Sequence, residues 1–201
     1  MINAINFERT ALSRKPDQLI RRELKALREE DRLTPDLVFR DPYRCRKITP
    51  QAIGGAMGAT FYLEPISTYD LDIFVLFEDP PLILTLTPVY EFLRKRGHEP
   101  EGDAVSIHGW PVQFLPAESP LLVEAVQQAN AVEYEGVPMR VMAAEHLMAI
   151  ALQTGRAKDF SRLLAFLESG VADYPRLHDI LQRHGLVDAW SRFEKTYPRN
   201  P

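Results

Sequence analysis

The spacing of apolar residues changes along the chain and predicts where its elements lie. Between Pro16 and Asp31, apolar side chains return at helical spacing on one side of a charged segment, which predicts a helix with a narrow apolar stripe. Residues 33–50 contain three prolines and show no sustained period, so we predict an irregular connector there. The chain therefore changes character near Arg46.

From residue 53 onward, short apolar runs alternate with amphipathic segments. Strands are expected at residues 72–77, 104–108, 112–115 and 138–142, and helices at 54–63, 87–96 and 120–129, followed by four more at 144–153, 159–168, 174–183 and 186–195. This order predicts an α/β (α+β) fold with a small mixed β-sheet flanked by helices and a C-terminal helical tail. The expected domains are residues 1–46 (helix and connector), 47–142 (α/β core) and 143–201 (helical region).

The composition narrows the classes of protein. With 24 basic and 28 acidic residues, the net charge is −4 and the pI is about 5.8, which argues against a protein that coats nucleic acid. Cys45 is the only cysteine, which excludes an internal disulfide and a cysteine-rich zinc site. The polar N-terminus lacks the apolar stretch of a signal peptide, and the strongest apolar run, Ile73 to Phe77, is too short to span a membrane. We therefore expect a cytoplasmic protein with no membrane partner.

Two aspartates stand at the start of the strand predicted at residues 72–77. Asp70 and Asp72 are two residues apart, so in an extended chain both carboxylates project from one sheet face, about 7 Å apart. Two carboxylates this close repel one another unless a cation lies between them. Mg²⁺ fits, because it takes oxygen ligands and usually keeps water or phosphate in its other positions. The pair therefore predicts a magnesium site that holds a nucleoside triphosphate.

A pair of glycines precedes these aspartates. Gly54 and Gly55 lie at the start of a predicted helix, where they permit a phosphate to approach the backbone N–H groups. Ser67 and Thr68 offer hydroxyl donors to the same phosphate. A plainer interpretation stays open, because Gly-Gly pairs are common in turns and Asp-x-Asp is common at solvated strand entrances. The two motifs in this order favour the functional interpretation.

These motifs, with a third in the C-terminal region, resemble the nucleotidyltransferase superfamily, particularly its small abortive-infection (AbiEii-type) and related bacterial members. The third motif is the phrase EHLMAIALQTGRAKD, which ends in Arg156, Lys158 and Asp159. The resemblance covers roughly residues 53–168, more than half of the chain. It implies a small mixed sheet flanked by helices.

The resemblance also implies a function. Asp70 and Asp72 would be the catalytic residues and would bind Mg²⁺ and a nucleoside triphosphate, in an in-line displacement at the α-phosphate. Arg156 and Lys158 are assigned to phosphate binding, and Asp159 is a further candidate. The acceptor in this family is a hydroxyl of a protein, an RNA or a small molecule, and some members act as toxins of two-gene defence or toxin–antitoxin loci, which implies a partner protein.

The sequence departs from the family's pattern at two positions. A third carboxylate on a later strand is replaced by Gln113, and a lysine in the helix before the last motif is replaced by Ala151. A neutral amide is a poor substitute for a carboxylate that holds a metal ion and accepts a proton. Arg156 and Lys158 also have a plain alternative interpretation as solvated charges at a helix junction that Gly155 creates.

The residues leave two functions open. The first is an active nucleotidyltransferase, and the second is a catalytically silent module of the same fold that binds nucleotide and acts through a partner protein. The five histidines, at residues 98, 108, 146, 178 and 184, show no metal-ligand spacing and are expected at the surface or in packing. A second resemblance, of residues 27–43 to a phrase in PD-(D/E)xK-type nuclease proteins, stops before any nuclease core, and we assign it no catalysis.

Overall fold

The computed structural model describes residues 48–64, 68, 70–77, 86–107, 110–134 and 137–198. The strands are β1 (Ile48–Ile53), β2 (Leu71–Phe77), β3 (Pro100–Glu101), β4 (Ala104–Ile107), β5 (Trp110–Pro116), β6 (Asn130–Tyr134) and β7 (Val137–Val141). The helices are α2 (Gly55–Ala59), α3 (Thr87–Arg94), α4 (Pro120–Gln127), α5 (Ala144–Thr154), α6 (Ala157–Ser169), α7 (Tyr174–Arg183) and α8 (Val187–Thr196). In this part of the chain, no helix combines the length and the apolar character needed to cross a membrane.

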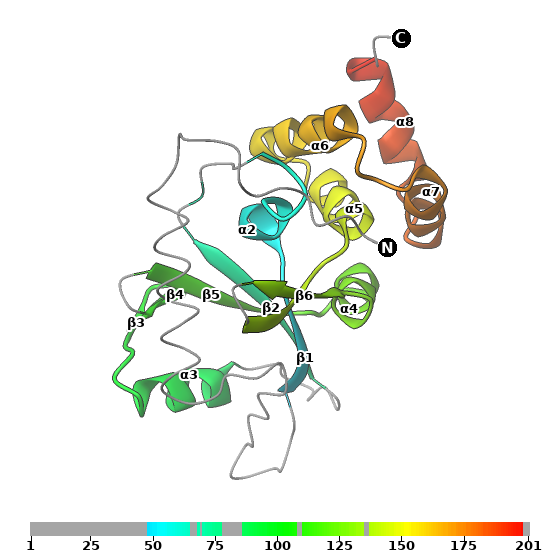
Figure 1. Ribbon diagram of the computed structural model, residues 1–201. Helices are drawn as coiled ribbons and strands as arrows, with labels where there is room; N and C mark the ends of the chain where they lie inside the picture. Colours follow the sequence, from blue (N-terminus) through cyan, green and yellow to red (C-terminus); the bar gives the residue numbers. More distant parts are fainter. Residues whose placement is uncertain are drawn as a thin grey trace.

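The strands form one mixed sheet in the order β3-β4-β5-β2-β1-β7-β6 (Figure 1). Strand β2 pairs parallel with β5, and β1 pairs parallel with β7, whereas β1 and β2 are antiparallel. The two hairpins, β4 with β5 and β6 with β7, are also antiparallel. The mixed sheet predicted from the alternating pattern is confirmed.

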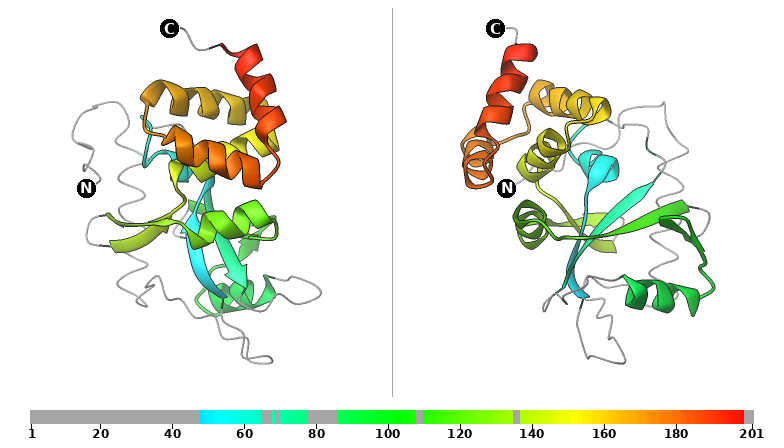
Figure 2. Two further views of the ribbon diagram at one scale, coloured as in Figure 1. Left: turned by 90° about the vertical axis from the view of Figure 1, so that its right-hand side faces the viewer. Right: turned by 180° about the vertical axis from the view of Figure 1, so that it is seen from behind.

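The two faces of the sheet carry separate hydrophobic clusters. Phe74 of β2 belongs to the larger cluster, together with residues of α2, α4, α5, α6, α7 and α8. Its neighbours Val75 and Phe77 belong to the smaller cluster, which α3 covers with Val89 and Leu93. Because successive residues of a strand point to opposite faces, Asp72 shares the face of Phe74. Figure 2 shows α2 between the sheet and helices α5 and α6.

Three strands were not expected from the sequence, and one of them corrects the predicted connector. Residues 48–50 belong to β1, not to an irregular segment. Pro50 obscured this strand, and the structure accommodates it within a shift of register between Ile48 and Gln51. β3 has only two residues, and β6 is a short segment of five residues that begins at Asn130. The predicted helix at 54–63 is also shorter, since α2 ends at Ala59.

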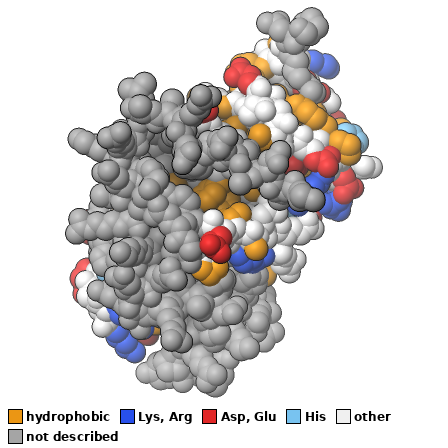
Figure 3. All heavy atoms as spheres, in the orientation of Figure 1, with side chains coloured by type: hydrophobic (Ala, Val, Ile, Leu, Met, Phe, Trp, Pro, Cys, Tyr) orange, Lys and Arg blue, Asp and Glu red, His pale blue; other side chains and the backbone are white. Residues whose placement is uncertain are grey.

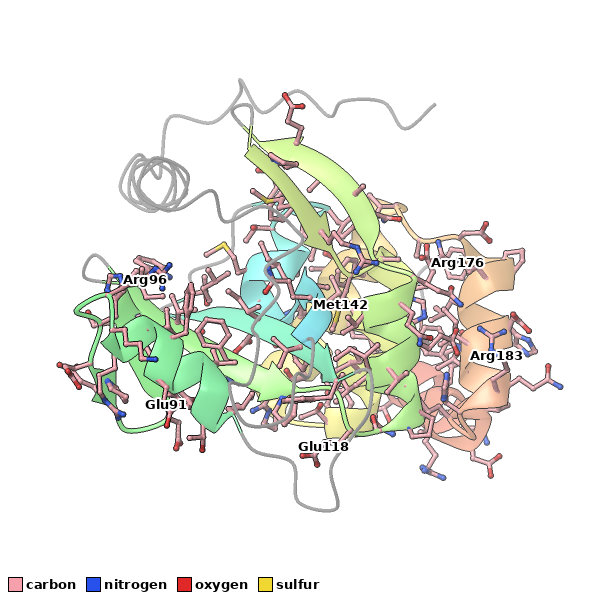
Figure 4. All side chains as sticks on the ribbon, turned by 90° about the horizontal axis from the view of Figure 1, so that it is seen from below. Glu91, Arg96, Glu118, Met142, Arg176 and Arg183 are labelled. Carbon is pink, nitrogen blue, oxygen red and sulfur yellow. The ribbon has the colours of Figure 1, made fainter. Side chains whose placement is uncertain are left out.

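The four C-terminal helices lie where the pattern predicts them. Gly155 and Gly170 end α5 and α6 in the left-handed conformation, with φ of 68° and 65°. Fully buried residues of α5 to α7, such as Met148, Phe166 and Ile180, pack in the same cluster as Phe74. Met142, labelled in Figure 4, lies in this interior between the sheet and the helices. The helical region therefore shares its core with the sheet.

Ion pairs fix α7 against α4 and α5. The carboxylate of Glu124 on α4 accepts from Arg183 and contacts the ring nitrogens of His146 and His184, at 3.2 and 2.8 Å. Glu145 on α5 pairs with Arg176, at 3.5 Å. Figure 4 shows both arginines on α7. In the space-filling view, acidic and basic side chains lie side by side at the end of the molecule that carries α7 and α8 (Figure 3).

The N-terminal predictions lie outside the described residues. These are the helix at 16–31, the connector before residue 48, the phrase at 27–43, and the segment 1–46 as a whole.

Candidate functional site

The glycine motif and the aspartate motif meet at the start of β2. The backbone N–H of Gly54 donates to the carbonyl of Asp72 at 3.0 Å, which ties the entrance of α2 to β2. Gly55 has a φ of 58°, and a Cβ added there would lie 1.9 Å from Oδ2 of Asp72. The carboxylate of Asp72 therefore lies directly against the bare backbone of Gly55. Only glycine permits both the positive φ and this approach.

Gly54 has a packing reason of its own. A Cβ at this position would lie 2.6 Å from the ring of Phe74 and 3.0 Å from the sulfur of Met142. Its N–H already donates to Asp72, and α2 comprises only five residues. The structure thus explains Gly54 by packing and by the strand contact, while a role in phosphate binding stays a prediction for both glycines.

Asp70 and Thr68 form a contact at the entrance of β2. The hydroxyl of Thr68 lies 3.1 Å from Oδ1 of Asp70 and 3.2 Å from its carbonyl oxygen, so it donates to Asp70. Asp70 is exposed, whereas Asp72 is half-buried. The predicted hydroxyl donor Thr68 therefore orients a carboxylate. Ser67, the other predicted donor, lies outside the described residues.

Burial and charges of both signs act on the carboxylate of Asp72. Burial raises the pKa of its carboxyl above the ordinary value of 3.8, and the like charge of Asp70 raises the pKa further. The charges of Arg162, Lys158 and Arg156, in that order, act in the opposite direction. Negative charge at the entrance of β2 and positive charge at the start of α6 thus act together on Asp72.

Asp159 organises the cations of α6. Its carboxylate is only 1% exposed and accepts from Nε of Arg156 at 2.7 Å and from Nη1 of Arg162 at 3.4 Å. Gly155 ends α5 and Arg156 precedes the first turn of α6, so the predicted helix junction is present. The junction nevertheless brings Arg156 and Lys158 within electrostatic range of Asp72.

Arg162 is the residue that sequence reasoning missed. Its side chain is 14% exposed, its charge opposes the raised pKa of Asp72 more strongly than that of Lys158 or Arg156, and its Nε has no hydrogen-bond partner in the described part of the chain. The available signal was its position three residues after Asp159, which places the two on one helix face. The sequence predicted Asp159 only as the first residue of a helix, and not as a buried partner of Arg156 and Arg162.

Gln113 lies beside Asp72 in the sheet. The parallel register of β2 and β5 pairs Asp72 with Gln113, so their side chains leave the sheet on the same face. Asp103, in the turn between β3 and β4, acts electrostatically on Tyr90 of α3. Ala151, where the family has a lysine, is buried in α5 with 2% exposure. Neither Asp103 nor Ala151 supplies a charge that acts on Asp72.

The carboxylates of Asp70 and Asp72 supply part of the ligand set that Mg²⁺ requires. Asp70 and Asp72 offer the carboxylate oxygens that Mg²⁺ prefers, and phosphate and water usually occupy its other positions. Across the described ranges, no three His, Cys, Asp or Glu side chains group as a metal-binding set. The residues therefore suit an ion that arrives with a phosphate ligand, rather than one held by protein alone.

A separate open hollow of about 590 Å³ lies between α3, the β3–β4 turn and β5. Its lining includes Tyr90, Glu91, Asp103 and Gln113, but neither Asp70 nor Asp72. The convergence of opposite charges at Asp72 leads us to place the candidate site there.

Comparison with known proteins identifies the fold. The crystal structure of an antigenic nucleotidyltransferase-like protein from Paracoccidioides brasiliensis matches with a TM-score of 0.54 and 14% identity, over 74% of this chain and 80% of that chain. The antibiotic-resistance factor ANT(2'')-Ia matches with a TM-score of 0.47 and 13% identity, over 90% and 97% of the two chains. The crystal structure of a protein described as a nucleotidyltransferase, from Thermotoga maritima, matches with a TM-score of 0.40 and 15% identity, over 77% of this chain and 94% of that chain. No protein-family model matches the chain, and no curated protein matches it significantly. The first likeness shows a nucleotidyltransferase-like fold.

Proposed function

We propose that this protein binds a magnesium–nucleoside triphosphate complex at Asp70 and Asp72 and transfers its nucleotidyl group to a hydroxyl. The observation that carries the proposal is the convergence on Asp72. Its carboxylate lies against Gly55, and the charges of the α6 cations act on it. A nucleoside triphosphate with its metal ion suits both groups of residues. The metal ion would bind the carboxylates of Asp70 and Asp72, and the α6 cations would bind phosphate oxygens.

In the proposed reaction, the acceptor oxygen forms a bond to the α-phosphorus. The bond from that phosphorus to the bridging oxygen breaks, and pyrophosphate leaves with the electron pair. The hydroxyl proton passes to water. A bound Mg²⁺ supplies charge neutralisation at the phosphate oxygens. Asp70 and Asp72 orient the complex, and Arg156 and Lys158 bind phosphate oxygens.

The acceptor and the biological setting are parts of the same proposal. The family resemblance favours a hydroxyl of a protein, an RNA or a small molecule as the acceptor. It also favours a two-gene toxin–antitoxin or defence locus, in which a partner protein would control the activity.

A second function is favoured by one observation. Gln113 lies in register with Asp72, where a third carboxylate would complete the site, and an amide accepts no proton. A silent module that binds nucleotide without turnover, and acts through a partner protein, is therefore the alternative.

The test measures binding and transfer separately. Magnesium with each nucleoside triphosphate should raise the melting temperature by mass action, and Asp72→Asn should abolish the rise. Asp103→Asn is the matched control, because Asp103 acts on Tyr90 and not on Asp72. A rise that survives Asp72→Asn would refute this site.

Transfer is then followed with α-labelled nucleoside triphosphates and a cell lysate as the source of acceptors. Label that reaches an acceptor, and requires Asp72, supports the enzyme. Binding without transfer supports the silent module.

A further inference from the structure

Two of the three cations that act on Asp72, Arg156 and Arg162, bind the same buried carboxylate. Asp159 accepts from Arg156 through Nε and Nη2, at 2.7 and 3.4 Å, and from Arg162 through Nη1 at 3.4 Å. Arg156 is the N-cap residue of α6, Asp159 and Arg162 lie in its first two turns, and Asp159 is 1% exposed. Because the carboxylate is shared, the two guanidinium groups keep a defined relation to each other. Asp159 thus acts as a positioning residue.

Arg162 has donor capacity that the described residues do not use. Its Nε is buried and lacks a hydrogen-bond partner there, although a guanidinium donor buried without a partner is unfavourable. Nη1 of Arg140 and Nδ1 of His146 are also buried without partners, so this feature alone is not diagnostic. Arg162 differs because its charge acts on Asp72, more strongly than those of Lys158 and Arg156. Its planar fork suits a phosphate oxygen.

Among the described residues, the site offers two carboxylates, Asp70 and Asp72, which are few for two divalent cations. A two-metal site clamps the attacking and leaving oxygens with two ions held by several carboxylates. Here Asp70 lies at the entrance of β2, two residues before Asp72, and the neutral Gln113 stands in register beside Asp72. Positive charge comes instead from Arg156, Lys158 and Arg162. Two of these side chains, Arg156 and Arg162, are bound by Asp159 and offer the positive charge that a second ion would bring.

We propose that this site works with one divalent cation, and that Arg156 and Arg162, positioned by Asp159, bind the phosphates in place of a second. This inference rests on the proposed function and adds to it. The ion belongs to Asp70 and Asp72, and the arginines hold phosphate oxygens on the α6 side. Arg162 becomes a phosphate-binding residue.

The first test counts ions. Mn²⁺ replaces Mg²⁺, the nucleotide is an α,β-methylene triphosphate analogue that cannot transfer, and the free Mn²⁺ signal is read by electron paramagnetic resonance. We expect one bound Mn²⁺ per bound analogue. Two bound ions that both depend on Asp72 would overturn the inference while leaving the proposed function intact. No analogue binding, or binding indifferent to Asp72→Asn, would instead refute the proposed function.

The second test concerns Arg162. Arg162→Gln should weaken analogue binding roughly 10- to 100-fold, the loss expected for charge-assisted hydrogen bonds. Arg162→Lys, which keeps the charge but loses the fork, should recover part of the affinity. Arg192→Gln, at an exposed position of α8, makes the same charge change and should leave affinity unchanged. An affinity unaffected by Arg162→Gln in folded protein would overturn the role of Arg162.

Discussion

Gly55 joins two requirements in one residue. Its φ of 58° belongs to the region that glycine favours, and its absent side chain leaves room for the carboxylate of Asp72. The sequence motif revealed the glycine and the aspartate, but not that they touch, because a contact across 17 residues depends on how β1 and β2 pair. The contact between Gly55 and Asp72 in the folded chain therefore explains why glycine stands at position 55.

Gly55→Ala separates these two requirements when it is compared with Gly170→Ala. Both positions have a similar positive φ, and a Cβ at Gly170 meets nothing within 4 Å. Gly170→Ala should lose about 1–2 kcal/mol of stability, or roughly 2–8 °C in melting temperature, and Gly55→Ala should lose more because its Cβ also meets Asp72. Only Gly55→Ala should also lose the stabilisation by magnesium and nucleotide, because it displaces the Asp72 carboxylate. Equal nucleotide responses in the two variants would disprove this.

Gln113→Glu tests whether the missing carboxylate limits the reaction. The side chain keeps its size and gains a charge in register with Asp72, so the protein without metal should be less stable and its response to magnesium larger. Transfer should rise, and general-base assistance is typically worth ~10²–10⁴ in rate. Gln153→Glu, at an exposed position of α5, is the control and should change neither property. Brisk transfer by the unaltered protein would show that Gln113 imposes no limit.

At the scale of elements, the position of α7 depends on Glu124. Its carboxylate faces His146 on α5 and Arg183 and His184 at the end of α7, with Asp179 also paired to Arg183. Hydrogen bonds from Arg183, His184 and His146, against the effect of burial, lower the pKa of Glu124 from 4.5 to about 2. The helices were predictable from their apolar period, but this polar junction was not, because its members are far apart in sequence.

The lowered pKa of Glu124 sets the pH at which its contribution is lost. A carboxyl with a depressed pKa in the folded state stabilises the protein above its unfolded value and loses this effect as pH falls. Glu124→Gln should therefore lower the urea midpoint at pH 7, and the difference from the unaltered protein should shrink between pH 4.5 and about 2. Glu118→Gln, at an exposed position before α4 (Figure 4), is the control and should leave the urea midpoint at pH 7 nearly unchanged. A constant difference across this range would contradict the assignment.

Element boundaries were less predictable than element types. The long amphipathic helices α5 to α8 follow from their period and from the glycines between them. β1 was not predicted because Pro50 lies within it, and β3 and β6 were not predicted because they are short. The sheet order could not be predicted either, since β1 lies between β2 and β7, and β7 is distant from β1 in the chain.

At the scale of the whole molecule, one cluster links the sheet with the helical region. Phe74 of β2 and Ile180 of α7 belong to the same buried set. We therefore expect residues 47–142 and 143–201 to unfold in one cooperative transition, although their patterns differ.

Ile180→Ala tests this cooperativity. Ile180 is fully buried, so the variant should lose about 2–5 kcal/mol and lower the melting temperature by roughly 4 °C or more. Val187→Ala, at a position 38% exposed, should have little effect. Near-ultraviolet and far-ultraviolet circular dichroism should report one midpoint in each variant. A second transition confined to helical signal would show that the helical region melts independently.

The junction between β1 and β7 has a consequence for hydrogen exchange. Among the described residues, the hairpin of β6 and β7 joins the sheet through the single parallel pair Ile53 and Val141, with a bond from the N–H of Met142 to Ile53 at 3.0 Å. Its amides should exchange through a local opening of lower free energy than those of β2, which pairs on both sides. Ile53 directly precedes Gly54, and the sulfur of Met142 packs against it. A nucleotide that binds at Gly54 and Gly55 should therefore slow deuterium uptake in the β6–β7 hairpin, although it does not contact that hairpin.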